Sequence, residues 1–183
     1  MNFKITKIPG DKKILRKRLE KVEFPLSKEV IEAADWMIDY IDKSQLPGFE
    51  DRAGVGIAAN QIGVDQRMFY VNIPLGDKQE NYIEFLMNPE FIAKGDIPAA
   101  LEGGEGCLSV PEGWPHTDGL VHRQFKIIIK GYSYIQKKEV KITKTGYEAI
   151  VFQHEMDHIN AGLFYDRIDQ KKPWVKKQKE VII

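Results

Sequence analysis

Apolar positions at helical spacing follow Ser27 and form the first regular pattern along the chain. The residues on this face are Val30, Ile31, Ala34, Met37, Ile38 and Ile41. The spacing predicts an amphipathic helix over residues 28–43, and Ser27 is a typical N-cap for it. Pro47-Gly48 and the charged residues after it predict a loop.

Four later segments have the composition of β-strands. They are residues 68–73, 83–87, 126–132 and 138–143. In the last of them Val140 and Ile142 alternate with lysines, as on a strand with one buried face. Because these segments lie close together in sequence, we expect them to pair in antiparallel fashion.

A second helix is predicted over residues 146–160. It is apolar on nearly every side, so we expect it to be buried, and Gly162 is expected to end it. Strands in the middle of the chain with two helices, and no β-α-β alternation, predict an α+β fold.

The composition is that of a globular protein. The chain has 183 residues, of which 43% are hydrophobic and 30% charged, so we expect one domain over residues 1–183. No stretch approaches the ~18 apolar residues of a membrane helix, and residues 1–7 lack the apolar core of a secretory signal. The single cysteine excludes an internal disulfide. We therefore expect a reducing compartment and no membrane insertion.

The net charge of zero hides an uneven distribution. Residues 4–21 carry a charge of +6 and residues 171–183 a charge of +4, so the rest of the chain is acidic. Two interpretations remain open at this point. The basic ends are solvated surface segments, or they bind RNA or another polyanion.

The predicted second helix carries the motif His154-Glu155-Met156-Asp157-His158. Histidines four residues apart lie on one face of a helix and can share a metal ion. Glu155 lies around the helix from His154, where its carboxylate can act as a general base without being a ligand. On a buried helix these groups are costly unless they are paired or bind a metal.

A third protein ligand is needed to complete such a site. The metzincin pattern requires histidine at position 164, which is Phe164, and the only glutamate downstream is Glu180 in a lysine-rich tail. The sole cysteine, Cys107, lies in a glycine-rich segment and is the leading candidate, since thiolate binds Zn²⁺ or Fe²⁺ strongly. A small buried core residue is the alternative interpretation of Cys107.

Small residues dominate the segment from Gly54 to Gly63. They allow a substrate backbone to approach closely, and Gln61 offers an amide donor. The segment is not a dinucleotide-binding loop, because the position of its third glycine is Ala59. A tight strand or turn without a binding role is an equally good interpretation of the segment by itself.

Three motifs, taken in order, resemble those of the peptide deformylase family. They are Gly54-x-Gly56-x-Ala58-Ala59-x-Gln61, Glu105-Gly106-Cys107-Leu108-Ser109 and Gln153-His154-Glu155-x-Asp157-His158. The resemblance extends from about Val30 to Phe164. The long connection before the second motif, and Gly119-Leu120-Val121-His122-Arg123 after it, resemble the Gram-positive-type (type II) branch.

The resemblance implies an activity and a fold. It implies removal of the formyl group from the N-terminal formyl-methionine of new polypeptides in the bacterial cytoplasm, with release of formate. It also implies mixed β-sheets wrapped around the helix that carries the histidine motif.

The resemblance further implies the role of each site residue. Cys107, His154 and His158 would hold one divalent ion, with Fe²⁺ native and Zn²⁺, Ni²⁺ or Co²⁺ able to substitute. Glu155 would be the acid/base, and the Gln61 amide and the Leu108 N–H would stabilise the oxyanion. The substrate site would be formed by Val55, Gly56, Glu105, Gly106, Ile150 and Val151.

Some features fall outside the motifs. Arg123 is expected to pair with Glu105 behind the metal site. The stretch Pro111–His116 is either a rim of the cleft or a surface loop with a half-buried Trp114. His116 and His122 lack the spacing of metal ligands and are left out of the site.

The tail and the overall function also leave alternatives open. Residues 181–183 either close a sheet as an edge strand, or the basic tail contacts ribosomal RNA; DNA is not an expected partner. Two alternatives to the deformylase function stay open. The protein is an inactive homologue that binds ribosomes or RNA through the basic ends, or it is a metallopeptidase that uses the histidine motif.

Overall fold

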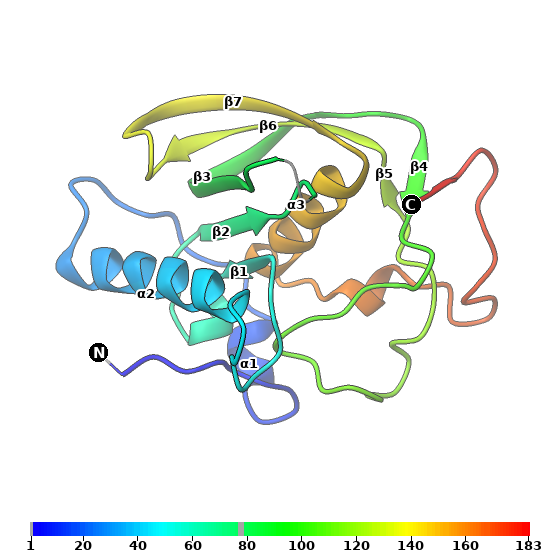
Figure 1. Cartoon of the computed structure of the whole chain (residues 1–183), viewed down its shortest axis with the longest axis horizontal. Helices are drawn as coiled ribbons and strands as arrows, with labels where there is room; N and C mark the ends of the chain where they lie inside the picture. Colours follow the sequence, from blue (N-terminus) through cyan, green and yellow to red (C-terminus); the bar gives the residue numbers. More distant parts are fainter. Residues whose placement is uncertain (1, 77–78) are drawn as a thin grey trace.

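The larger sheet is antiparallel and has the strand order β1-β2-β3-β6-β7 (Figure 1). Its strands are β1 (Gly56–Ala58), β2 (Met68–Ile73), β3 (Tyr82–Lys94), β6 (Lys126–Ser133) and β7 (Lys138–Thr145). The computed structural model describes residues 2–76 and 79–183, so Met1 of the predicted domain lies outside the described residues.

A second, smaller sheet forms from segments far apart in the sequence. Its strands are β4 (Pro98–Ala100), β5 (Arg123–Gln124) and β8 (Val181–Ile182), in the order β5-β4-β8. β4 pairs antiparallel with β5 and parallel with β8. The edge-strand prediction for residues 181–183 is therefore confirmed for the first two of them.

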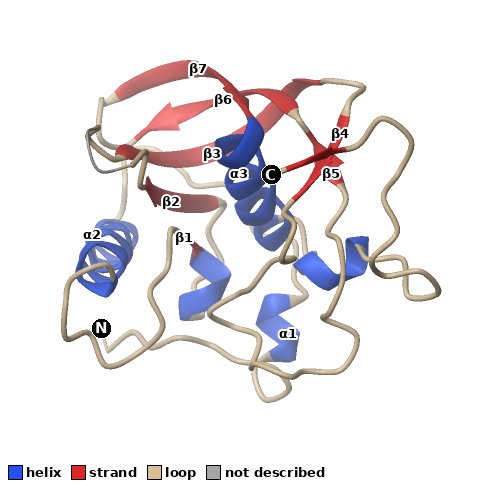
Figure 2. Ribbon diagram, turned by 45° about the vertical axis from the view of Figure 1, so that its right-hand side comes forward, coloured by secondary structure: helices blue, strands red, loops and turns tan. Residues whose placement is uncertain are grey.

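One helix lies between the two sheets (Figure 2). This helix, α3 (Gly146–Ile159), contacts β1, β2 and β7 of the larger sheet and β4 and β5 of the smaller one. The other helical segments are α1 (Lys12–Leu15), α2 (Lys28–Ser44) and the 3₁₀ turns η1 (Ala59–Ile62) and η2 (Phe164–Arg167). The α+β prediction, with sheets around a central helix, is confirmed.

The core lies where α2 and α3 pack against β2. Every residue of β2 is buried, and Phe69 on it meets Phe152 of α3 edge to face at 5.7 Å between ring centroids. The Ser27 side chain accepts a hydrogen bond from the Val30 N–H at the start of α2, as expected for an N-cap. No helix within residues 2–76 and 79–183 is long and apolar enough to cross a membrane.

The predicted regular elements are all present, and β3 extends well beyond its predicted end. The elements that the sequence pattern missed are α1, η2, β4 and β5, none longer than four residues. Segments this short do not complete enough of a helical or strand period to be recognised.

Gly162 takes part in ending α3, as predicted, but it is not the residue in the left-handed conformation. That conformation belongs to Ala161, with φ of 68°. The Gly162 N–H donates to the Asp157 carbonyl at 2.8 Å and the Ala161 N–H to the His158 carbonyl at 3.3 Å, which is a Schellman motif. Glycine suits position 162 for space, because a Cβ there would lie 3.2 Å from the Asp157 Cβ.

The segment before β8 is held by a buried polar pair. His122 Nδ1 lies 2.7 Å from Glu180 Oε1, and their side chains are 5% and 0% exposed. The other oxygen of Glu180 accepts the Lys177 N–H at 2.9 Å. This pair fixes the course of the chain into β8.

Glu180→Ala is expected to lower the free energy of unfolding by about 1–3 kcal/mol, because His122 and the Lys177 N–H lose their partner. Chemical denaturation followed by circular dichroism measures the change. Lys177→Ala is the control, since it keeps the backbone N–H and removes an exposed side chain. Equal unfolding midpoints for the two variants would contradict the assignment.

Candidate active site

The three predicted metal ligands converge at one point beside α3. His154 and His158 lie one turn apart on the helix, with ring centroids 5.1 Å apart. Cys107 Sγ lies 3.2 Å from His158 Nε2. One ligand atom from each of the three side chains can be chosen so that all lie within 4.8 Å of one another.

This set of donors fits a divalent transition metal ion. Two ligand atoms of a tetrahedral zinc ion with ordinary bond lengths lie about 3.5 Å apart, close to the separation of Cys107 and His158. Burial by itself raises the pKa of the Cys107 thiol, but the charge of His158 and hydrogen bonds with both histidines lower it to about 5. Cys107 is therefore poised as a thiolate, the form that binds a metal.

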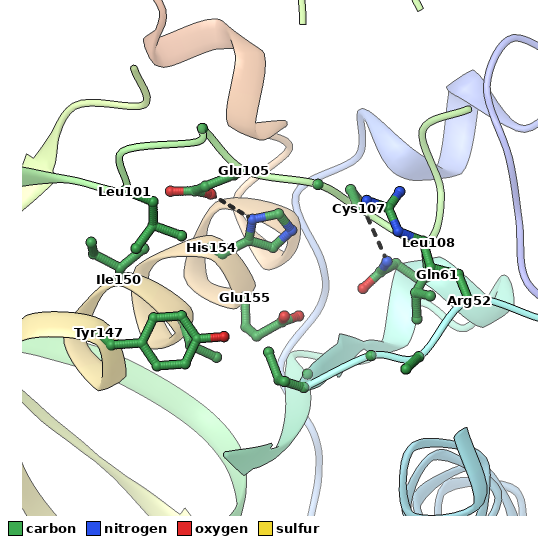
Figure 3. Close-up of a pocket in the computed structure, with 17 residues that line it drawn as sticks. Arg52, Gln61, Leu101, Glu105, Cys107, Leu108, Tyr147, Ile150, His154 and Glu155 are labelled. Atoms are coloured by element: carbon green, nitrogen blue, oxygen red, sulfur yellow. Dashed lines mark hydrogen bonds and ion pairs between the residues drawn. The ribbon is translucent and has the colours of Figure 1, made fainter. Parts of the chain in front are cut away.

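His154 is oriented by a carboxylate on the opposite side from the ligand cluster. Its Nδ1 lies 2.8 Å from Glu105 Oε2, which leaves Nε2 to face the site (Figure 3). Glu105 also accepts two hydrogen bonds from Arg123, at 2.5 and 2.8 Å. The predicted pairing of Arg123 with Glu105 is confirmed, and the Arg123 side chain is completely buried.

The ionic network extends further than the sequence indicated. Arg123 Nη1 donates to Asp157 Oδ2 at 2.9 Å, and Asp157 accepts a bidentate pair from Arg167. Burial would raise the pKa of Glu105, but the charge of Arg123 lowers it below its ordinary value. Asp157 belongs to the third motif. Its partners Arg123 and Arg167 lie outside all three motifs, so the motifs could not predict these ion pairs.

Gln153 attaches α3 to the strand that carries Arg123. Its side chain accepts the Gln124 N–H at 3.0 Å and donates to the Gln124 carbonyl at 2.8 Å. Gln124 is the neighbour of Arg123 on β5. This pair of hydrogen bonds therefore fixes the position along the axis of α3 at which Arg123 contacts the helix. The first residue of the third motif thus contributes to the geometry of the network.

Glu155 is a buried carboxylate for which no ion pair is found among the described residues. It is 3% exposed, and its Oε2 has no hydrogen-bond partner among the described residues. Burial raises its pKa to about 7. A Cβ at Gly56 would lie 2.5 Å from Glu155 Oε1, so only glycine leaves room for the carboxylate at this point of β1.

The Gln61 amide is fixed with its NH₂ group toward Cys107. Its Oε1 accepts the Ala58 N–H at 2.9 Å, and its Nε2 lies 3.2 Å from Ser109 Oγ and 3.5 Å from Cys107 Sγ. Gln61 belongs to η1, so the small-residue segment forms both a strand and a turn. No hydrogen bond from the Leu108 N–H is found among residues 2–76 and 79–183.

A cavity of about 250 Å³ opens beside these groups (Figure 3). The predicted catalytic and substrate-binding residues all line it: Gln61, Leu108, Glu155, Val55, Gly56, Glu105, Gly106, Ile150 and Val151. Cys107 and His154 line it as well, whereas His158 lies behind them and is 1% exposed. Gly54 of the first motif also lines the cavity, and the wall is completed by residues outside the three motifs: Arg52, Ala53, Leu101, Gly104 and Tyr147.

The stretch Pro111–His116 is a surface loop in which Trp114 is half-buried, as one of its two interpretations predicted. Within the described residues none of this stretch lines the cavity beside the ligand cluster, but Pro111 and Glu112 line a neighbouring cavity. His116 is exposed and His122 is paired with Glu180, and neither belongs to the ligand cluster. The cavity therefore combines a cluster of metal-binding donors, a carboxylate able to exchange a proton near neutral pH, and amide donors.

Comparison with known proteins gives a consistent result. The family model described as polypeptide deformylase matches residues 3–174. The chain is 44% identical over 194 residues to the peptide deformylase of Mycoplasmopsis pulmonis, covering 98% of each chain. It is 40% identical over 172 residues to that of Staphylococcus epidermidis, covering 92% of this chain and 91% of the relative.

Solved structures of peptide deformylases are similar as well. The Met-Ala-Ser-bound class I type b enzyme of Acinetobacter baumannii superposes with a TM-score of 0.73 at 28% identity, covering 92% of this chain and 99% of that one. The enzyme of Thermotoga maritima gives a TM-score of 0.71 at 30% identity, with the same coverage.

Arg123→Ala is expected to lower the free energy of unfolding by about 3–5 kcal/mol, because it leaves Glu105 and Asp157 buried without their shared cation. Denaturant unfolding of the metal-free protein measures this effect. Arg167→Ala is the matched control, since it removes the exposed arginine of the same network. A loss no larger than that of the control would contradict the central role of Arg123.

Proposed function

The chain belongs to the polypeptide deformylase family, and on that premise we propose that Cys107, His154 and His158 hold its metal ion while Glu155 moves the protons of the reaction. It is a metal-dependent hydrolase that removes the N-terminal formyl group from formyl-methionine of nascent polypeptides and releases formate. The residue assignments rest on one observation, the convergence of these three donors beside Glu155, whose Oε2 has no hydrogen-bond partner in the described part of the chain. Residues 1–183 are proposed to form a single catalytic domain.

We propose ferrous iron as the native metal, as the resemblance to the deformylase family implies, with Zn²⁺, Ni²⁺ or Co²⁺ able to replace it. One thiolate and two imidazoles suit all of these ions, so availability in the cell decides which is bound. When bound, the ion supplies Lewis acidity and lowers the pKa of water toward ~7. The thiolate of Cys107 is also the oxidisable form of cysteine, which makes an iron-loaded site sensitive to oxygen.

Glu155 is the acid/base in the proposed reaction. Its pKa of about 7 allows it to accept a proton from the attacking water and later to give it up at neutral pH. Water adds to the formyl carbon, the C–N bond breaks, and the proton held by Glu155 goes to the leaving amine. The products are formate and a free methionine amino group.

Gln61 and Leu108 donate hydrogen bonds to the oxygen that becomes negatively charged. The Gln61 amide is already oriented by Ala58 and Ser109, so it does not have to reorganise during the reaction. The Leu108 N–H forms no hydrogen bond that has to break first within the described part of the chain. Losing one such donor typically raises the barrier by about 3–4 kcal/mol.

The methionine side chain is proposed to lie against the apolar part of the cavity wall. Val55, Ile150 and Val151 supply this surface, and the backbones of Gly56 and Gly106 allow close approach. Glu105 contributes mainly by holding His154. A formyl carbon bears only hydrogen, so a narrow site beside Glu155 accepts formyl and excludes acetyl groups.

We further propose that the enzyme works in the bacterial cytoplasm and contacts the ribosome through its basic ends. Residues 4–21 carry a charge of +6, which suits the phosphate backbone of RNA. The inactive-homologue and metallopeptidase alternatives are not favoured by the family match and the similar enzymes.

Formate release from a formyl-Met tripeptide tests the function directly. Protein purified without oxygen should release formate from this peptide and leave the acetyl-Met peptide unchanged. Formate measured by an enzyme-coupled assay, with metal content determined on the same sample, separates inactivity from metal loss. No formate from protein with one metal ion per chain would contradict the function.

Glu155→Ala is expected to keep the metal and lose about 10²–10⁴-fold in kcat, since it removes a proton-transfer group and not a ligand. Its unfolding free energy should not fall, because Oε2 of the wild-type carboxylate is buried without a hydrogen-bond partner among residues 2–76 and 79–183. Metal analysis, kcat and denaturation are measured together, with Cys107→Ser as the variant expected to weaken metal binding. Loss of metal from Glu155→Ala would show that Glu155 is a ligand.

A further inference from the structure

Arg52 lies at the mouth of the catalytic cavity and is not used by the reaction as derived so far. It precedes β1, and its side chain is 46% exposed. Within residues 2–76 and 79–183 its one ion contact is with Glu112 at 4.0 Å, and that carboxylate is 85% exposed. No hydrogen bond of the Arg52 guanidinium is found among the same residues, so its planar set of donors is free to bind another group.

The guanidinium lies against the backbone next to the metal cluster. A Cβ at Gly106 would lie 2.2 Å from Arg52 Nη2, and Gly106 directly precedes Cys107. Arg52 thus reaches from the segment before β1 toward the loop that carries Cys107 and Leu108 (Figure 3). It therefore lies between two sides of the cavity wall, the segment before β1 and the loop that carries Cys107.

Arg52 also connects the catalytic cavity to a second one. This neighbouring cavity, of about 230 Å³, shares Arg52, Cys107 and Leu108 with the first. A methionine side chain held in the first cavity leaves the rest of the peptide to continue outward. The second cavity adjoins the first at Arg52, so it is the nearest hollow that could receive this part of the peptide.

The charges around the second cavity indicate which atoms Arg52 would bind. Its lining contains two cations, Arg52 and Lys7, and two carboxylates, Asp51 and Glu112. This balance gives no strong preference for an acidic peptide side chain. Peptide carbonyl oxygens are present whatever the sequence, and a guanidinium has several N–H groups that can donate hydrogen bonds to them.

We propose that Arg52 is a substrate-binding residue that donates hydrogen bonds to main-chain carbonyls of the residues after methionine. This inference rests on the proposed function. It explains how one enzyme can hold nascent chains of many sequences, since the contact is made to the backbone. It also assigns the second cavity as the path of the downstream peptide.

The test compares substrates of increasing length with amidated C-termini: formyl-Met amide, formyl-Met-Ala amide and formyl-Met-Ala-Ser amide. Arg52→Ala should lower kcat/KM for the longest peptide by about tenfold, the factor that one charge-assisted hydrogen bond supplies. The loss should appear in KM, with kcat nearly unchanged, and should be smallest for formyl-Met amide. Arg52→Lys should recover part of the loss.

Arg18→Ala is the matched control, because it removes an exposed arginine that lines neither cavity. An equal fall in kcat for all three substrates would mean that Arg52 has a structural role and would overturn the proposal. A loss confined to a peptide with Asp in place of Ser would show side-chain recognition and would overturn it too. Failure of the wild type to release formate from any substrate would instead refute the proposed function.

Discussion

The cost of burying charge constrains this protein more than any other interaction. Arg123 is completely enclosed, and such a group is tolerated only where carboxylates surround it. Glu105 and Asp157 provide them, and Glu105 in turn holds His154. The loop before Cys107, strand β5 and helix α3 must therefore meet in one arrangement, and the ligand cluster gains its geometry from that requirement.

The core and the site are built from opposite sides of α3. One side supplies Phe152 to the apolar core against β2, the opposite side carries His154 toward the cavity, and Glu155 reaches the cavity from between them. A helix that is apolar on nearly every side could rotate in a core of similar side chains. The two hydrogen bonds between Gln153 and Gln124 and the Arg123–Asp157 pair prevent this rotation.

The metal-binding residues could be predicted from the sequence, whereas most of the side chains that hold them in place could not. The histidine spacing indicated two ligands, and the shortage of a third pointed to Cys107, which the structure places 3.2 Å from His158. Partners such as Arg167 for Asp157 could not be predicted, because a long-range ion pair leaves no periodic pattern. Arg52 looked like an ordinary charged loop residue, and only the fold brings it over Gly106.

Because β8 pairs with β4, one side of the cavity wall is supported by the last residues of the chain to be synthesised. The Glu102 N–H donates to the Ile183 carbonyl at 2.9 Å, directly beside Leu101 in the cavity wall. Chains emerge from the ribosome N-terminus first at about 5–20 residues per second, so this support arrives several seconds after Cys107 has been made. A newly started copy therefore has an unfinished cavity wall while its own N-terminus is already exposed, and an older, finished copy is better placed to process it.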